Sequence, residues 1–314
     1  MQLRPLLAAL LTISLFGLMG CQPLGVQSSP SPLPKPDGMN EDIPDRSAES
    51  ERLVRHYAYL QNDLLAQGLM RADGGGPDAR FSKDDLVENF LRIALYDEYI
   101  FTNGRLIARE SPSRLRRWEE QVRIGVNFGA SIPVAQREKD QLNIRRYAQR
   151  LSRVTDHSIV VAENVNFHIL ILNEDERKNY APQLKALIPG TSDRIITSIL
   201  TMPRPTLCHV FAFSGGAGDN TYNTAVAIVR GEHPDLTRLA CIHEELAQGL
   251  GLANDSRDAR PSIFNDDEEF ALLTRHDELL LEILYDPRLR PGMTPGDARE
   301  TVELIAAELM GGNS

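Results

Sequence analysis

Strand-like segments of this chain are confined to its middle, and helix-like segments lie on both sides of them. Segments that alternate in polarity or are rich in β-branched residues predict strands; they are 122–128, 158–161, 165–172, 207–213 and 224–230. Apolar residues at helical spacing predict helices; these cover 48–69, 134–154, 174–187, 235–250, 268–285 and 295–310. This order is typical of one α+β domain with a helical layer at its N-terminus.

Two local signals refine this order. Ser82 stands before two aspartates and an apolar helical pattern, so we predict that it is an N-cap. Pro182 is expected to interrupt the helix in which it lies, because proline removes a backbone donor. We divide the folded part of the chain into an N-terminal helical region, 51–114, and an α+β domain, 115–314. The first region is expected to stay helical to about Pro112.

The first twenty residues have the pattern of an export signal. Arg4 lies ahead of the apolar run 6–19, which is shorter than a membrane span and typical of a signal-peptide core. The run ends in the sequence LMGC, which resembles the lipobox of bacterial lipoproteins. The resemblance implies that residues 1–20 are removed and that Cys21 carries acyl chains such as palmitate, since stable anchoring needs at least two chains. The alternative is a plain secretory signal with a chance cysteine.

The segment after the cysteine is predicted to be a tether. Residues 21–50 are dominated by Pro, Ser and Gly, so they bury too little apolar surface to offset the entropy of ordering. Gln22 rather than Asp follows the cysteine, a pattern that resembles lipoproteins sorted to the outer membrane. We therefore expect a cell-envelope protein that is lipid-anchored to the outer membrane through Cys21 and faces the periplasm.

Charge and cysteine content exclude two classes of protein. Lys plus Arg number 34 and Asp plus Glu number 44, a formal net charge of −10. Nucleic-acid-binding proteins need a basic surface, so no nucleic-acid partner is expected. Three cysteines are too few for a disulfide-rich scaffold. An oxidising envelope favours a disulfide between Cys208 and Cys241; two separately buried thiols are the alternative.

The most informative segment is one predicted helix and the turn after it, with the sequence CIHEELAQGLGLAND over residues 241–255. His243 begins a pattern like HExxH, in which two histidines bind the zinc ion of a metallopeptidase. Ala247 stands where the second histidine would lie, and alanine has no ligand atom. The sequence therefore excludes a conventional HExxH site here.

A longer pattern fits when the frame is moved by one residue. The pattern EExxQxxGxxN, from Glu244 to Asn254, overlays HExxHxxGxxH, the signature of the metzincin metallopeptidases. Glu244 and Gln248 are four residues apart and share one helix face. Gly251 can end the helix and reverse the chain. Asn254, or Asp255 beside it, can then return to the same metal ion.

The resemblance to metzincins implies a role for each position. It implies a peptidase-like fold, with Glu245 as the general base and with a metal held by Glu244, Gln248 and Asn254 or Asp255. In the following SIFND segment, which begins at Ser262, Phe264 stands where metzincins have the methionine of their Met-turn. The wider pattern, over roughly 115–290, resembles a bacterial family known only as a domain of unknown function. Its members resemble envelope lipoproteins.

The ligand set leaves several interpretations open. Zinc prefers imidazole and thiolate, whereas carboxylate and amide oxygens suit Mg²⁺, Ca²⁺ or Mn²⁺. The first interpretation is a hydrolase with one unusual divalent metal ion, in which Glu245 activates water. In the second interpretation, His243 or His276, which lie outside the pattern, takes part in the site. An unrelated chemistry is a further alternative. The substituted ligands favour another interpretation, in which a non-catalytic module holds an envelope protein or peptide.

Four further candidates lie outside the motif. His276 stands beside acids on a predicted helix, where a surface ion pair is expected. The acidic run 266–269 is expected to be the first turn of the following helix, in preference to a calcium site without EF-hand spacing. His209 lies on the predicted strand 207–213, and the metzincin resemblance implies substrate binding there if this strand is an edge. His168 is expected to lie within the sheet.

Overall fold

The computed structural model describes residues 43–102, 105–216 and 218–311. Residues 41–314 form one compact unit, and all elements given below belong to it. The predicted export signal, the predicted lipidation site Cys21 and most of the predicted tether lie outside the described residues. None of the described helices is long and apolar enough to cross a bilayer.

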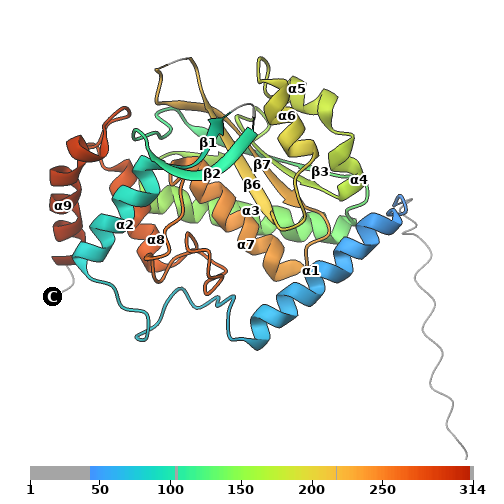
Figure 1. Ribbon diagram of the computed structural model, residues 1–314, viewed down its shortest axis with the longest axis horizontal. Helices are drawn as coiled ribbons and strands as arrows, with labels where there is room; N and C mark the ends of the chain where they lie inside the picture. The colour runs from blue at the N-terminus through green and yellow to red at the C-terminus, as the bar shows by residue number, and fades with distance from the viewer. Residues whose placement is uncertain (1–42, 103–104, 217, 312–314) are drawn as a thin grey trace, which may run out of the picture. The chain divides into compact units, whose positions relative to one another are not determined.

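A five-stranded sheet forms the centre of this unit, and the chain is a mixed α+β protein (Figure 1). The strands lie in the order β4-β3-β5-β7-β6. β3, β4, β5 and β7 are parallel, whereas β6 pairs antiparallel with β7 at the edge. The carboxyl ends of the four parallel strands therefore meet at one border of the sheet. The strands are β3 (Val122–Phe128), β4 (Ile159–Val161), β5 (Phe167–Leu172), β6 (Cys208–Ser214) and β7 (Tyr222–Arg230).

Helices cover both faces of the sheet, and the side chains of β5 show the two layers. Ile169 and Ile171 belong to a large apolar core shared with α3 and α7. Leu170 and Leu172 belong to a second core shared with α5 and α6. Burial on both faces explains why β5 is apolar along most of its length. The four helices are α3 (Val134–Thr155), α5 (Ala181–Leu187), α6 (Asp193–Leu200) and α7 (Asp235–Leu250).

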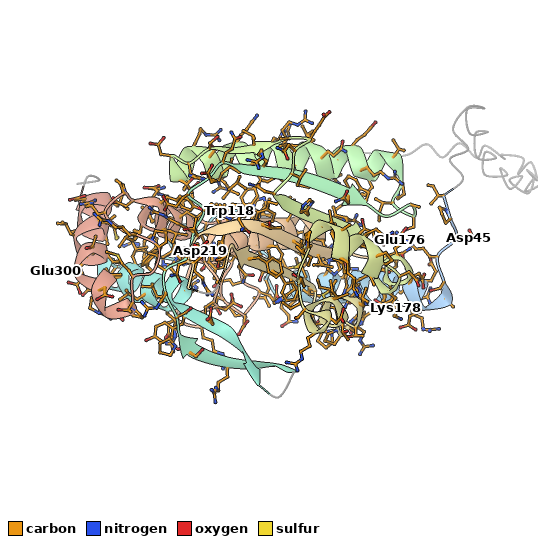
Figure 2. All side chains as sticks on the ribbon, turned by 90° about the horizontal axis from the view of Figure 1, so that it is seen from above. Asp45, Trp118, Glu176, Lys178, Asp219 and Glu300 are labelled. Carbon is orange, nitrogen blue, oxygen red and sulfur yellow. A yellow bond between two sulfur atoms is a disulfide. The ribbon has the colours of Figure 1, made fainter. Side chains whose placement is uncertain are left out.

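The C-terminal helices α8 (Arg275–Tyr285) and α9 (Pro295–Gly311) extend the larger core. The single tryptophan, Trp118, joins this core to the sheet. Its ring stacks on Phe167, with ring centroids 6.1 Å apart, and its indole N–H donates to the Gly249 carbonyl at 2.8 Å. Figure 2 shows Trp118 in the body of the molecule, among the packed side chains.

The N-terminal region departs from the sequence prediction after its second helix. The N-cap predicted at Ser82 is confirmed, because its hydroxyl accepts from the Asp85 N–H at the start of α2 (Lys83–Leu95). The prediction of helix to about Pro112 is wrong. β1 (Tyr96–Thr102) and β2 (Arg105–Pro112) instead form an antiparallel hairpin, which projects from the body in Figure 2. The aromatic and β-branched run YIFT within β1 favours strand over helix.

The first helix, α1 (Ala48–Ala66), agrees with the predicted helix 48–69. The tether predicted to reach residue 50 ends earlier, because Ser47 caps this helix and donates twice to Asp175. The Ser50 hydroxyl donates to Glu232 at 2.6 Å. α1 is thus fastened to the segments that follow β5 and β7, at the carboxyl ends of these strands.

Three further differences concern helix ends and one short helix. The predicted helix 174–187 is divided, as Pro182 indicates, into α4 (Glu174–Lys178) and α5. The short α6 was not predicted from the sequence. The predicted helix 268–285 begins only at Arg275, because Thr274 and Asp277 form a capping box there.

Candidate functional site

Helix α7 carries the motif acids, and it packs against the two strands at the edge of the sheet, β6 and β7. Glu245 is buried, whereas Glu244 and Gln248 are partly exposed. The general base implied by the metzincin resemblance is therefore the least accessible of the three side chains. The two partly exposed side chains face the surface from successive turns of one helix.

Two glycines allow α7 to pack and to end where it does. At Gly249, a Cβ atom would lie 2.4 Å from the Phe167 ring. Gly251 is the C-cap of α7 and has a φ of 132°, which favours glycine. A Cβ atom at Gly251 would also lie 2.2 Å from the backbone oxygen of Arg116. The chain therefore turns at Gly251 with its backbone against a neighbouring segment.

The metal-ligand positions of the metzincin pattern are occupied by groups that hydrogen-bond to the protein. The Gln248 side-chain amide donates to Asp255 Oδ1 at 3.3 Å. Asn254 is buried, and its side-chain amide donates to the backbone oxygen of Arg92 at 3.0 Å. Amide and carboxylate oxygens are also poor zinc ligands compared with imidazole and thiolate. The residues at these positions do not fit a catalytic zinc ion.

The segment that begins at Ser262, for which the metzincin resemblance implies a Met-turn, lies beside α7 and is fixed by α8. Asp277 accepts hydrogen bonds from Ser262 Oγ at 2.5 Å and from the Ile263 N–H at 3.1 Å. Phe264 is fully buried in the core. Ile263 and Glu244 line the same small cavity. The structure therefore brings this segment next to the motif helix.

An acidic cavity of about 50 Å³ opens beside Glu244. Burial and the nearby charges of Asp266 and Asp267 raise the pKa of Glu268. Among the described residues that line this cavity, none is basic. Such a lining suits a hard cation such as Ca²⁺, Mg²⁺ or Mn²⁺ better than zinc. Its four carboxylates belong to Glu244, Asp255, Asp266 and Glu268.

The acidic run 266–269 does not form the first turn of a helix, so that prediction is wrong. Glu268 has a φ of 57°, and its backbone oxygen accepts from the Met70 N–H at 2.8 Å. Glu269 forms ion pairs with Arg71 and Arg260. The run is a loop held against the segment before α2, and α8 starts six residues later.

Two larger cavities adjoin the acidic cavity, and we call the three together the charged groove. A cavity of about 480 Å³ shares Asp255 and Asp266 with the acidic cavity. A further cavity of about 310 Å³ lies between α2, the hairpin and α9. It shares Arg92 and Asp258 with the 480 Å³ cavity. The charged groove therefore runs from the motif helix past the β1–β2 hairpin to α9.

The charged groove carries both signs of charge. Arg92 forms an ion pair with Glu110 at 3.0 Å. Arg109 and Arg257 are exposed at the 480 Å³ cavity, and neither makes an ion pair with any other residue that the structure describes. The groove thus presents two guanidinium groups beside several carboxylates. This arrangement suits a partner that carries an acidic group.

The two histidines considered as alternative ligands are buried and line no part of the charged groove. His243 stacks on Tyr147 with ring centroids 3.8 Å apart, and its Nδ1 accepts from the Leu273 N–H. Burial lowers the pKa of His243 to about 3. His276 Nε2 lies 3.2 Å from the side-chain amide of Asn89 on α2. The surface ion pair predicted for His276 is therefore wrong, and neither imidazole is placed to bind a metal in the groove.

Strand β6 is one of the two edge strands of the five-stranded sheet, and His209 lies on it. The ring of His209 packs edge-on against Phe211, with ring centroids 4.6 Å apart. Burial lowers the pKa of His209 to about 4 and also lowers that of His168 on β5. The edge position is the one from which a strand can pair with an added peptide.

A disulfide joins Cys208 at the start of β6 to Cys241 in α7. It fastens the edge strand to the motif helix one turn before Glu244. Cys208 Sγ lies 4.0 Å from Glu244 Oε2, and Cys241 Sγ lies 3.8 Å from His233 Nδ1. Cys208, Glu244 and Glu245 each offer one ligand atom, and these atoms lie within 4.8 Å of one another.

Sequence reasoning missed most of the charged residues of the charged groove, including Arg109 and Arg257. Arg109 lies in the hairpin that was predicted to be helical, and Arg257 lies in a loop without a motif. No sequence pattern marks either residue. The acidic run 266–269 does mark Glu268, but its interpretation as a helix start gave it a different role.

Comparisons with known proteins identify a family but no activity. No curated protein and no solved structure matches the chain. The sequence model of a family described as a protein of unknown function (DUF2927) matches residues 83–304. The match covers more than two thirds of the chain and begins at α2, earlier than the expected residue 115. This chain therefore belongs to the DUF2927 family of proteins of unknown function.

Proposed function

We propose that this protein is a lipid-anchored binding module of the cell envelope, in which a metallopeptidase-like domain holds a partner in its charged groove without catalysis. The main observation behind the proposal is that side chains at the metal-ligand positions form hydrogen bonds with other groups of the protein. Gln248 donates to Asp255, and Asn254 donates to the backbone of Arg92. Two of the three metal-ligand positions carry amides, and none carries the imidazole or thiolate that zinc prefers.

The order of elements supports the metallopeptidase-like part of the proposal. An edge strand, a motif helix that ends at Gly251, and a buried segment around Phe264 follow one another along the chain. These are the features that the metzincin resemblance implies. Fold likeness carries no activity by itself, so the function rests on the groove rather than on the fold.

The envelope location rests on the sequence of the first residues. The sequence LMGC ends an apolar run, and Cys21 is the expected lipidation site. Cells given an alkyne analogue of palmitate should label the wild-type chain, and the Cys21→Ala variant should lose the label. Equal labelling of both chains would contradict the anchor.

The chemistry of the groove indicates the kind of partner. Arg109 and Arg257 are open to an acidic group, while Asp255 and Asp266 lie nearby for a basic or amide group. A protein or peptide segment supplies both kinds of group. Guanidinium and carboxylate contacts of this type are charge-assisted and directional.

Site-specific photo-crosslinking in cells tests the binding function. A photoreactive amino acid is placed at Arg109 or at Arg257, with Arg194 on α6 as the matched control. We expect the same discrete adduct from both groove positions and none from the control. Arg257→Glu should abolish the adduct formed from position 109. Identical adducts from all three positions, or none from the groove, would contradict the proposal.

A second candidate function is a hydrolase that uses a hard cation, with Glu245 as general base. The four-carboxylate cavity beside Glu244 favours it, because a cation relieves the repulsion that contributes to the raised pKa of Glu268. Calorimetric titration with Ca²⁺, Mg²⁺ and Mn²⁺ tests this candidate. It requires about one ion per chain, lost in Asp266→Asn. The absence of heat with all three ions would reject it.

A further inference from the structure

We propose that reduction of the Cys208–Cys241 disulfide opens a zinc site formed by the two thiolates together with the carboxylates of Glu244 and Glu245. This inference goes beyond the proposed function, which concerns the charged groove of the oxidised protein. It concerns the same helix in a different redox state. Zinc binds thiolates more tightly than the amide and carboxylate oxygens of the motif, so reduction would add the ligands that zinc prefers.

The helix geometry brings three of the four ligands to one side of α7. Cys241, Glu244 and Glu245 are three and four residues apart, so their side chains lie on one helix face. Cys208 faces them from the first residue of β6. Its sulfur lies 4.0 Å from Glu244 Oε2.

The distances between the ligand atoms are close to those of a tetrahedral zinc site. The ligand atoms of Cys208, Glu244 and Glu245 lie within 4.8 Å of one another. With bonds of about 2.3 Å to sulfur and about 2.1 Å to oxygen, two ligand atoms on one zinc ion lie about 3.5 Å apart. Zinc binding therefore requires the most distant of these atoms to approach by about 1.3 Å.

A buried imidazole beside the sulfurs is the second observation that favours a metal here. His233 Nδ1 lies 3.8 Å from Cys241 Sγ. Its ring is packed edge-on against Tyr57 of α1, with ring centroids 4.6 Å apart. After reduction, a thiolate at Cys241 can accept a hydrogen bond from the Nδ1 side of this imidazole. Hydrogen bonds from a neighbouring imidazole to a metal ligand tune metal affinity.

The redox step has a simple balance. A dithiol reductant breaks the sulfur–sulfur bond by thiol–disulfide exchange, becomes a disulfide itself, and supplies two electrons and two protons. Cys208 and Cys241 then each carry a thiol. Zinc binding releases both thiol protons to solvent, because thiolate is the ligand form. Both cysteines are buried, and Cys208 is the more accessible residue, 9% against 2% exposed, so we expect the reductant to attack its sulfur first.

Zinc and cobalt titrations of the oxidised and reduced protein test the site. The chain from residue 41 is used, because it forms one compact unit and lacks Cys21. We expect about one zinc ion per reduced chain and none per oxidised chain. Anaerobic Co²⁺ should give a thiolate-to-cobalt charge-transfer band only in the reduced chain. Equal zinc binding in both states, or no such band after reduction, would overturn the proposal.

Variants separate this site from non-specific binding by free thiols. Glu244→Gln and Glu245→Gln, both reduced, should each weaken zinc binding at least about tenfold. Glu300→Gln on the exposed face of α9 is the matched control and should bind as the wild type does. Zinc should also raise the melting temperature of the reduced wild type. If both motif variants bind zinc as tightly as Glu300→Gln, the carboxylates are not ligands and the proposal fails. The crosslinking experiment uses the oxidised protein, so its outcome is independent.

Discussion

Two features of the structure require glycine at position 251: the backbone there has a positive φ, and it lies close to the backbone of Arg116. Gly251→Ala should therefore lower the free energy of unfolding by about 2–4 kcal/mol, from left-handed strain and overpacking together. Gly190 has a φ of 82° with no atom within 4 Å of a built Cβ, so Gly190→Ala should cost only about 1 kcal/mol. Urea unfolding measures both. Equal losses would show that the contact with Arg116 has no energetic role.

The buried imidazole of His243 makes stability depend on pH. Its pKa is lowered to about 3 in the folded chain, whereas an unfolded histidine titrates near 6.5. The unfolded state therefore binds more protons between these values, and stability falls as pH falls below about 6.5.

Between pH 7 and pH 5, we expect His243 to account for a loss of about 1–2 kcal/mol in the free energy of unfolding. His243→Asn keeps an acceptor for the Leu273 N–H and removes this loss, although His209 still contributes in the same direction. Denaturant unfolding at several pH values compares the two chains. If the stability of the variant depended on pH as that of the wild type does, His243 would not be the source of this loss.

The motif residues could be predicted from the sequence, and most of the groove could not. Gly251 and Glu245 belong to one continuous pattern on a helix, so local spacing determines their relation. Arg109 and Arg257 are far apart in sequence and meet only because the hairpin lies beside the loop after α7. The burial of His276 under Asn89 and Phe81 also depends on how α2 packs, which no local pattern reveals.

The disulfide connects the edge strand to the motif helix, so it restrains two elements at once. It joins residues 33 apart in sequence, and a cross-link of that span stabilises by about 3–4 kcal/mol in the chain-entropy model. The double variant Cys208→Ala/Cys241→Ala should lose that amount in urea unfolding. A reductant should lower the wild-type midpoint and leave that of the double variant unchanged. A wild type insensitive to reductant would contradict this role.

Among the elements, the sheet strands were the easiest to predict and the hairpin was the hardest. β3 and α7 have the predicted bounds because their apolar patterns reflect burial against the core. The hairpin β1–β2 forms a two-stranded sheet of its own, outside the main layers. The apolar pattern of this segment therefore did not argue against a helix, and only the strand propensity of its residues indicated a hairpin.

For the molecule as a whole, the α+β class followed from the order of patterns, but the strand order did not. β5 lies between β3 and β7, and β6 reverses direction at the edge. These pairings join segments distant in sequence, and sequence periodicity gives the face of a strand but not its neighbour. The position of α1 across the ends of β5 and β7 likewise depends on Asp175 and Glu232, which are contacts that no periodicity encodes.

The proposed binding function requires that the motif helix α7 holds no catalytic metal ion in the oxidised protein. Elemental mass spectrometry of the oxidised chain, purified without chelators beside Glu244→Ala and Gln248→Ala, tests it most directly. We expect far less than one metal ion per chain in all three proteins, with both variants folded. About one metal ion per wild-type chain, lost in both variants, would instead establish the substituted site as a metal centre.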